Sequence, residues 1–297
     1  MSPALAAAVE EAIRAECGAR HTIKRTSAGP SGHFGKNWIS NTGDTQFFIK
    51  ALSASASGRF AAEADGLAAI AATGTIRTPR VVASGTTPDT AFLVLEYLPL
   101  RALNRDDGRR CAEAIAALHT HCGSRYGWHQ DNHIGASLQT NTWSDDWPRF
   151  YADHRLTPQL QAAAANGYQG ELQTCGERIL RQIAAFFLER RPQASLVHGD
   201  LWCGNVGVLE SGEPVIFDPA SHFGDREVDF AMSELFGGLP ESFYASYRAA
   251  APLAEGYDQR RMLYNFYHVL NHLNLFGAGY LRQAERMASE LTDYLRR

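Results

Sequence analysis

The segment SLVHGDLWCGN at residues 195–205 constrains the fold of this chain more than any other stretch. An apolar run enters His-Gly-Asp, and Asn205 stands five residues after Asp200. A hairpin pattern follows, made of VGVLE, the turn SGEP and VIFDPA, in which Asp218 ends the second strand. Because a hairpin returns the chain to its start, we expect Asp200, Asn205 and Asp218 to lie together.

The bulk composition is that of a globular protein that is large enough for two domains. The chain has 297 residues, of which 45% are hydrophobic and 20% charged. A net charge of −4 without any Lys/Arg-rich run argues against nucleic-acid and anionic membrane partners. No stretch approaches the roughly 20 apolar residues that span a bilayer, and the N-terminus lacks a signal-peptide pattern. Five cysteines without a CxxC pair favour the reducing cytoplasm, and we expect a monomer rather than an obligate oligomer.

The hydrophobic pattern changes along the chain from mainly strand to mainly helix. Strands are predicted at 21–27, 37–40, 45–50, 80–84 and 90–98. Helices are predicted at 3–17, 58–73, 106–122 and 176–191 and over most of the chain after 226, whereas 123–175 has an irregular pattern. These elements predict an α+β fold with two lobes. Its small sheet-rich N-terminal lobe would be residues 1–98, and its larger, mainly helical C-terminal lobe residues 99–297.

The spacing of Asp200, Asn205 and Asp218 is typical of a phosphotransferase. Phosphoryl transfer needs a carboxylate that accepts the proton of the attacking hydroxyl, and Asp200 is placed for that role. It also needs hard oxygen ligands for Mg²⁺, which the amide of Asn205 and the carboxylate of Asp218 offer. Taken singly, each residue is more typical of a turn, a cap or a strand end. Their joint spacing favours catalysis.

The first half of the chain supplies candidates for binding ATP. Lys50 ends the strand FFIK, and Glu63 lies thirteen residues later in the next helix, which fits a lysine–glutamate pair on the phosphates. The stretch 93–98, LVLEYL, fits a hinge that includes Tyr97. There the carbonyl of Glu96 and the N–H of Leu98 would contact the adenine edge.

The small-residue loop before the second strand is a weaker candidate for the phosphates. It contains Gly29, Gly32 and Gly35, which do not spell GxGxxG. Backbone N–H groups around Gly32 would still be able to cover phosphate oxygens.

The substrate is predicted to be small rather than a peptide strand. Only about ten residues separate Asp218 from the helix that carries Asp229, which leaves no room for the long activation segment of a protein kinase. A small hydroxyl-bearing molecule fits this arrangement better.

Long strings of the sequence resemble the fructosamine kinases, also called ketosamine-3-kinases. They are YGWHQDNHIGASLQTNTWSDDWPRFYADHRL, LVHGDLWCGN, IFDPASHFGDREVDFAMSELFGG and LYNFYHVLNHLNLFGAGY. The resemblance implies an α+β, bilobal protein-kinase-like fold similar to that of aminoglycoside and choline kinases, with ATP and Mg²⁺ as cofactors. It further implies phosphorylation of the 3-hydroxyl of small-molecule or protein-bound ketoamines (ribulosamine- or fructosamine-type adducts). Loss of that phosphate would release the amine and so initiate deglycation.

The resemblance also implies roles for single residues. Asp200 would be the proton acceptor, Asn205 and Asp218 the metal ligands, and Lys50 and Glu63 the phosphate-side pair. Trp202 would face the sugar, and an indole face does suit the C–H face of a sugar. His198 and Asp229 are expected to shape the loop rather than to touch substrate. Many eukaryotic relatives carry a cysteine in the phosphate loop that this chain lacks, and Cys203 is expected to be incidental.

Three other interpretations remain open at this point. The first is an ATP-dependent kinase of another small alcohol, such as an aminoglycoside or an amino alcohol. The second is a nucleotide-binding pseudokinase that acts as an interaction module. The third is a zinc hydrolase built on His119 and His121, or on His268 and His272.

Overall fold

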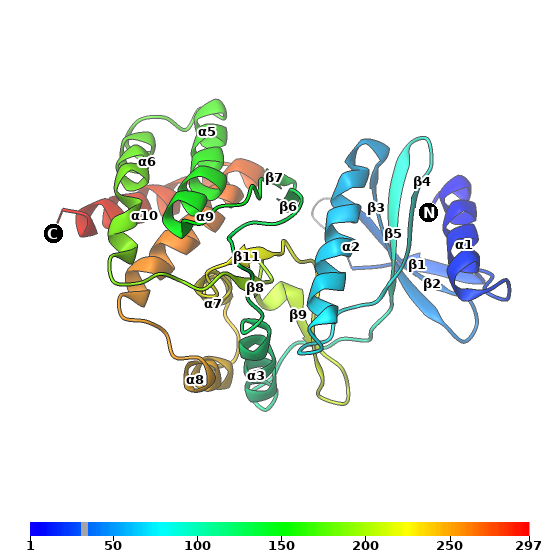
Figure 1. Ribbon diagram of the computed structural model, residues 1–297. Coiled ribbons are helices and arrows are strands. Elements are labelled where there is room, and N and C mark those ends of the chain that lie inside the picture. The colour runs from blue at the N-terminus through cyan, green and yellow to red at the C-terminus, as the bar shows by residue number, and fades with distance from the viewer. Residues whose placement is uncertain (31–34, 297) are drawn as a thin grey trace.

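The computed structural model describes residues 1–30 and 35–296. A five-stranded antiparallel sheet occupies the N-terminal third, in the spatial order β1-β2-β3-β5-β4 (Figure 1). Its strands are β1 (Arg25–Ala28), β2 (Lys36–Asn41), β3 (Gln46–Ser53), β4 (Val81–Thr86) and β5 (Thr90–Glu96). The predicted strands are confirmed, except that β1 begins four residues later than expected.

Two helices cover the two faces of this sheet. Helix α1 (Pro3–Cys17) buries Leu5, Val9 and Ile13 against one face, and α2 (Ser57–Ala72) packs on the other. The two faces explain why β5 is almost continuously apolar: Phe92 and Val94 lie under α1, whereas Leu93 and Leu95 lie under α2. The sheet thereby holds Lys50, on β3, at a fixed place relative to α2.

The remainder of the described chain is mainly helical. Its helices are α3 (Gly108–Leu118), α4 (Trp147–Tyr151), α5 (Thr157–Ala165), α6 (Glu171–Gln182), α7 (Glu227–Ser233), α8 (Glu241–Ala250), α9 (Tyr257–Phe276) and α10 (Leu281–Tyr294). Three short antiparallel pairs lie among them: β6 (Asn132–Ile134) with β7 (Ser137–Gln139), β8 (Ser195–Val197) with β11 (His222–Gly224), and β9 (Val206–Val208) with β10 (Pro214–Ile216). The α+β, two-part architecture is therefore confirmed, while the boundary between residues 98 and 99 stays a prediction.

Two expectations about this part of the chain were wrong. Residues 123–175 are not irregular throughout, because they contain β6, β7, α4 and α5. Asp146 caps α4 through its side chain, and Trp147 and Phe150 are buried, so tertiary packing stabilises a helix too short to show periodicity. The predicted helix 176–191 ends earlier: α6 stops at Gln182, and a 3₁₀ turn continues over Ile183–Phe187.

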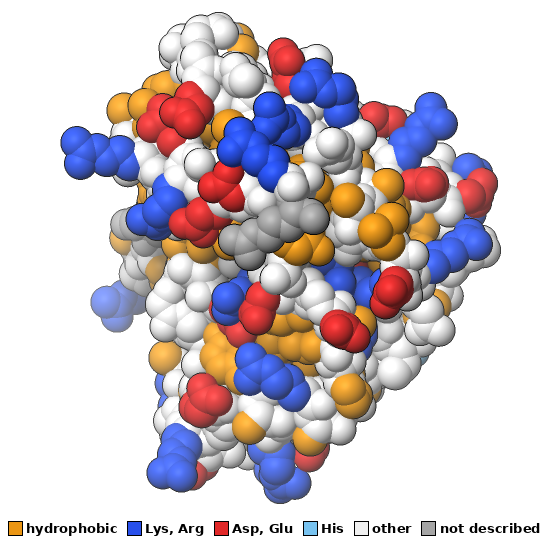
Figure 2. All heavy atoms as spheres, turned by 90° about the vertical axis from the view of Figure 1, so that its left-hand side faces the viewer, with side chains coloured by type: hydrophobic (Ala, Val, Ile, Leu, Met, Phe, Trp, Pro, Cys, Tyr) orange, Lys and Arg blue, Asp and Glu red, His pale blue; other side chains and the backbone are white. Residues whose placement is uncertain are grey.

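On the face of the molecule formed by the helical part, positive and negative side chains are not gathered into separate patches (Figure 2). Figure 2 shows this face, on which positive and negative side chains are interspersed and separated by apolar ones. Among the described residues, no helix combines the length and apolar character needed to cross a membrane.

Two buried histidines make the stability of the fold depend on pH. The ring nitrogens His222 Nε2 and His268 Nδ1 have no hydrogen-bond partner among the described residues. Burial lowers the pKa of each imidazole to about 3. The other charged or titratable groups that act on them are Arg155, Asp229 and His272.

We predict that this pKa shift destabilises the protein in acid. Below about pH 6.5 the unfolded chain takes up protons at these histidines and the folded chain does not, so stability is lost as pH falls toward 3. Each histidine should lower the free energy of unfolding by about 2 kcal/mol between about pH 7 and pH 5. Urea unfolding of wild type and His268→Leu at both pH values measures the difference. Leu270→Ala, on the same helix, is the control and should lose stability equally at both; an unchanged pH dependence in His268→Leu would contradict the prediction.

Candidate active site

A cavity of about 660 Å³ lies between the N-terminal sheet and the helical part. Its walls come from β2, β3, α2, the stretch 95–98, β6 and the two loops after β8 and β10. Among the lining residues are most of the predicted site residues, namely Lys50, Glu63, Glu96, Tyr97, Leu98, Asp200, Trp202, Asn205 and Asp218. Gly32 lies outside the described residues. The fold therefore brings to one cavity segments that are far apart in the sequence.

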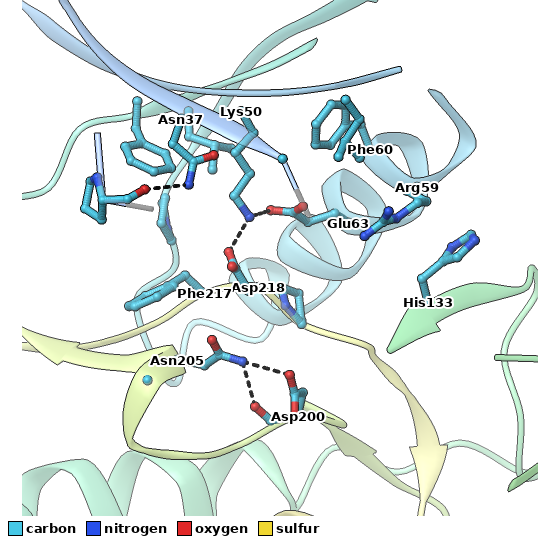
Figure 3. A pocket seen from close by; sticks show the side chains of 18 of the residues that line it. Asn37, Lys50, Arg59, Phe60, Glu63, His133, Asp200, Asn205, Phe217 and Asp218 are labelled. Carbon is cyan, nitrogen blue, oxygen red and sulfur yellow. Dashed lines mark hydrogen bonds and ion pairs between the residues drawn. The ribbon is translucent and has the colours of Figure 1, made fainter. Parts of the chain in front are cut away.

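The ammonium group of Lys50 lies between two carboxylates (Figure 3). It donates to Glu63 Oε1 at 2.6 Å and also contacts Asp218 Oδ1. Burial lowers the pKa of Lys50, but the charges of Asp218 and Glu63 outweigh burial and hold the pKa above its ordinary value. Lys50 is thus a permanent cation that joins β3, α2 and the end of the β9–β10 hairpin.

Asp229, on α7, binds the backbone of the loop after β8. The two oxygens of this buried carboxylate accept from the backbone N–H groups of His198, at 2.6 Å, and Gly199, at 2.8 Å. The ring Nε2 of His119 lies 3.1 Å from the same carboxylate. Burial raises the pKa of Asp229. The contact with His119 and the hydrogen bond from the Gly199 N–H act in the opposite direction, and together the favourable contacts hold the pKa below its ordinary value. As expected, Asp229 shapes the loop.

His198 fixes the two loops relative to each other. Its Nε2 donates to the carbonyl of Phe217 at 2.9 Å, and its Nδ1 accepts from the backbone N–H of Asp200 at 3.2 Å. These partners require a neutral imidazole with the proton on Nε2, and burial lowers the pKa of His198 accordingly. The interpretation of His198 as a hydrogen-bonding loop residue agrees with this geometry.

The glycine of the His-Gly-Asp sequence is required by the close approach of the two loops. Gly199 has φ +83°, and a Cβ there would lie 2.2 Å from the carbonyl oxygen of Ala220. No other residue fits without moving the backbone. The loop of Asp200 is therefore packed directly against the segment that follows Asp218.

Asp200 and Asn205 interact directly. The amide nitrogen of Asn205 donates to Asp200 Oδ2 at 3.1 Å and to the Asp200 carbonyl at 2.9 Å. Burial raises the pKa of Asp200 to about 7, and the charge of Asp218 acts in the same direction. Because its nitrogen is engaged, the amide of Asn205 has its oxygen left for another ligand (Figure 3).

Asp218 adopts a backbone conformation that non-glycine residues rarely use. Its φ is +58°, the only positive φ of a non-glycine residue among the described residues, and Pro219 follows it. Left-handed conformations of this kind concentrate at functional sites, where the surrounding structure holds them. Here the turn directs the carboxylate toward Lys50 and leaves it partly exposed to the cavity.

The stretch after β5 forms another part of the cavity wall. The carboxylate of Glu96 accepts from Arg77 Nη2 at 2.8 Å and from the backbone N–H of Arg80 at 3.3 Å, so its side chain is engaged with its own half of the chain. The roles predicted for the Glu96 carbonyl and the Leu98 N–H stay predictions.

Trp202 lines the cavity next to Asp200. Its indole lies over Gly204, where a Cβ would be 2.4 Å from the ring, and the ring of Phe236 is roughly perpendicular to it at 6.4 Å between centroids. The neighbouring Cys203 is exposed, and its thiol contacts the carbonyl of Phe236.

Sequence reasoning missed the residues that join α2 to the helical part. Arg59 Nη2 donates to the carbonyl of Gly135 at 2.6 Å, and Asp65 Oδ2 accepts from Trp128 Nε1 at 2.7 Å. Arg59, His133 and Gly135 also line the cavity. No spacing pattern marks these residues, because their partners come from the segment that seemed irregular.

The zinc interpretation has no support in the described residues, which contain no cluster of three or more His, Cys, Asp or Glu suited to a metal ion. The side chain of His119 contacts Asp229 and Tyr247, and that of His121 contacts the carbonyl of Ala117. The side chain of His272 contacts the carbonyl of His268. The histidines therefore do not converge on a common point.

We predict that Asp229→Asn destabilises the protein by about 3 kcal/mol, because a neutral amide replaces a buried charged acceptor and turns its NH₂ group toward an N–H donor. Urea unfolding at about pH 7 measures this, with the exposed Asp106→Asn as control. A loss no larger than that of the control would show that Asp229 does not hold the loop.

Comparison with known proteins identifies the family of the chain. The family model described as fructosamine kinase matches residues 5–294. A probable ketoamine kinase of Synechocystis sp. is 42% identical over 290 residues, which cover 97% of each chain. A chloroplastic protein-ribulosamine 3-kinase of Arabidopsis thaliana is 39% identical over 84% of this chain and 76% of its own.

Solved structures agree with this result. A putative fructosamine-3-kinase of Haemophilus somnus superposes with a TM-score of 0.89 at 29% identity, over 95% of this chain and 96% of its own. A thermostable mutant of an aminoglycoside phosphotransferase shares the fold alone, with a TM-score of 0.63 at 14% identity over 96% of this chain and 98% of its own. On the family match and these identities, the chain belongs to the fructosamine kinase family.

Proposed function

We propose that the protein transfers the γ-phosphoryl group of ATP to the 3-hydroxyl of a ketoamine of the ribulosamine or fructosamine type. The family and the names of its relatives support this reaction. The observation that carries it is the convergence of Lys50, Glu63, Asp200, Asn205 and Asp218 on one cavity. The preformed contacts of Lys50 argue against a pseudokinase that has lost its catalytic residues.

Asp200 is the proposed proton acceptor. It lies on a loop that Asp229 and His198 hold in place, so its position does not depend on the substrate. A pKa of about 7, raised by burial, suits a group that takes a proton from a hydroxyl near neutral pH. The Asn205 amide orients the carboxylate through its contact with Oδ2.

Asn205 and Asp218 fit a magnesium ion, which would neutralise charge on the transferring phosphoryl group. The fit rests on the donor set: the amide oxygen of Asn205, left by the engagement of its nitrogen, and the partly exposed carboxylate of Asp218 are both hard oxygen ligands. Lys50, held by Glu63, would bind the α- and β-phosphates, as in other kinases.

We further propose that residues 1–98 form the lobe that binds the nucleotide and that 99–297 form the catalytic and substrate lobe. In this arrangement the Glu96 carbonyl and the Leu98 N–H contact adenine, Tyr97 forms part of the same wall, and Gly32 belongs to the loop over the phosphates. The position of residues 96–98 in the cavity wall supports the proposed contact with adenine.

Trp202 is the proposed sugar contact, because its indole borders the cavity beside Asp200. The ketoamine would be free or attached to a protein amine, and the protein would act as a monomer without nucleic-acid or membrane partners. Cytoplasmic location is proposed as well, although curated plant relatives are named chloroplastic. Elimination of the new phosphate from carbon 3, followed by hydrolysis of the remaining imine by water, would free the amine and so reverse glycation.

The reaction is tested by ATP consumption over a panel of a ribulosamine, a fructosamine, an aminoglycoside and an amino alcohol. We expect turnover with the ketoamines, and phosphorus-coupled NMR should place the new phosphate on carbon 3. Turnover confined to the aminoglycoside or the amino alcohol would reject the ketoamine assignment in favour of another small-alcohol kinase.

We predict that Asp200→Asn keeps ATP binding and loses about 10²–10⁴-fold in kcat, because an amide cannot accept the hydroxyl proton. Nucleotide titration and steady-state turnover measure the two effects separately. Glu113→Ala, an exposed carboxylate on α3, is the control and should match wild type. Full activity in Asp200→Asn would show that another group accepts the proton.

A further inference from the structure

Helix α2 lies on the side of the N-terminal sheet that faces the helical part (Figure 1). Its side chains contact the helical part at several places along its length. Near its start, Arg59 contacts the carbonyl of Gly135 at 2.6 Å. One turn further on, Glu63 contacts Lys50, and Asp65 follows two residues later. At Gly66 an added Cβ would lie 3.2 Å from Pro219 Cγ and 3.3 Å from Ser221 Oγ, so the helix also packs closely on the segment after Asp218.

Asp65 makes an attachment that lies outside the lining of the cavity. Its Oδ2 accepts from Trp128 Nε1 at 2.7 Å, and its Oδ1 lies 3.2 Å from His129 Nε2. The carboxylate is about two-thirds buried, and the Trp128 side chain is 7% exposed. A charged acceptor on a buried indole N–H gives a strong hydrogen bond, and the N–H loses its partner if the carboxylate is removed.

Trp128 is itself firmly fixed in the helical part. Its backbone N–H donates to the Asn141 carbonyl at 2.9 Å, and its ring packs at 5.3 Å on Phe223, in β11. β11 pairs with β8, the strand that leads into the loop of Asp200. The indole of Trp128 is thus held in a fixed position near the loop that carries Asp200.

We propose that Asp65 is a positioning residue for the nucleotide site. By binding Trp128 it holds α2 on the helical part, so that Glu63 meets Lys50 and Lys50 meets Asp218 before any ligand binds. Asp65 acts through Glu63 and does not touch the reacting groups. The Lys50–Glu63 pair is consequently assembled without an activation segment or a partner protein. The effect on ATP rests on the proposed function, whereas the anchoring of α2 does not.

The anchoring is tested by hydrogen exchange of the ligand-free protein, which requires neither nucleotide nor ketoamine. Asp65→Ala and Trp128→Phe, which keeps a ring but loses the N–H donor, should each raise exchange over residues 57–72 about tenfold. The double variant should exchange no faster than either single variant, since both remove the same bond. Glu113→Ala should leave α2 unchanged. If either variant exchanged at the wild-type rate in α2, or if exchange rose uniformly over the whole chain, the anchoring role of Asp65 would be overturned.

The positioning role is tested by nucleotide titration. Asp65→Ala should weaken ATP binding about tenfold and leave the KM for the ketoamine within about twofold of wild type. In a Glu63→Gln background the same change should have less than about a twofold effect, because Asp65 acts through Glu63. If Asp65→Ala weakened ATP binding in the Glu63→Gln background as much as it does in wild type, the proposal would be overturned. If no ketoamine is turned over by wild type, the proposed reaction fails, while the exchange and binding results still decide the role of Asp65.

Discussion

The two ion pairs of Lys50 connect the three segments on which the site depends. Glu63 is thirteen residues away on the adjacent helix, and Asp218 is 168 residues away at the end of a hairpin. A buried ammonium group is tolerated only when charged partners compensate for the loss of water, so any relative shift of these segments leaves a buried charge unpaired. The same contacts that stabilise the cation therefore fix the geometry of the cavity.

The loop that carries Asp200 is shaped by interactions that do not touch the cavity directly. Asp229 accepts from two consecutive backbone N–H groups, and His198 connects the loop to Phe217. Gly199 permits contact with Ala220 that any side chain would prevent. These interactions keep the Asp200 carboxylate buried and close to that of Asp218, and burial, followed by the charge of Asp218, accounts for its raised pKa. A group poised near neutrality is thus a consequence of how the loop is held.

Helix α2 connects the N-terminal sheet with the helical part. It carries Glu63 toward Lys50, and it contacts the helical part through Asp65, Gly66 and Arg59. In a protein kinase, control of the equivalent lysine–glutamate pair is exerted through movement of a helix and of the activation loop. This chain has little sequence between Asp218 and α7 for such a loop. The contacts that attach α2 to the helical part are formed without such a loop.

The sequence by itself determined the local elements and the short-range site geometry. The spacing of Asp200, Asn205 and Asp218, and the separation of thirteen positions from Lys50 to Glu63, are informative because a loop, a hairpin or a strand–helix unit keeps these residues close. Tertiary structure alone decided that 123–175 forms helices and strands, that Asp65 meets Trp128, and that Asp218 meets Lys50. Such contacts join residues far apart in the chain, and no periodicity records them, because they arise only when separate elements bury their apolar faces together.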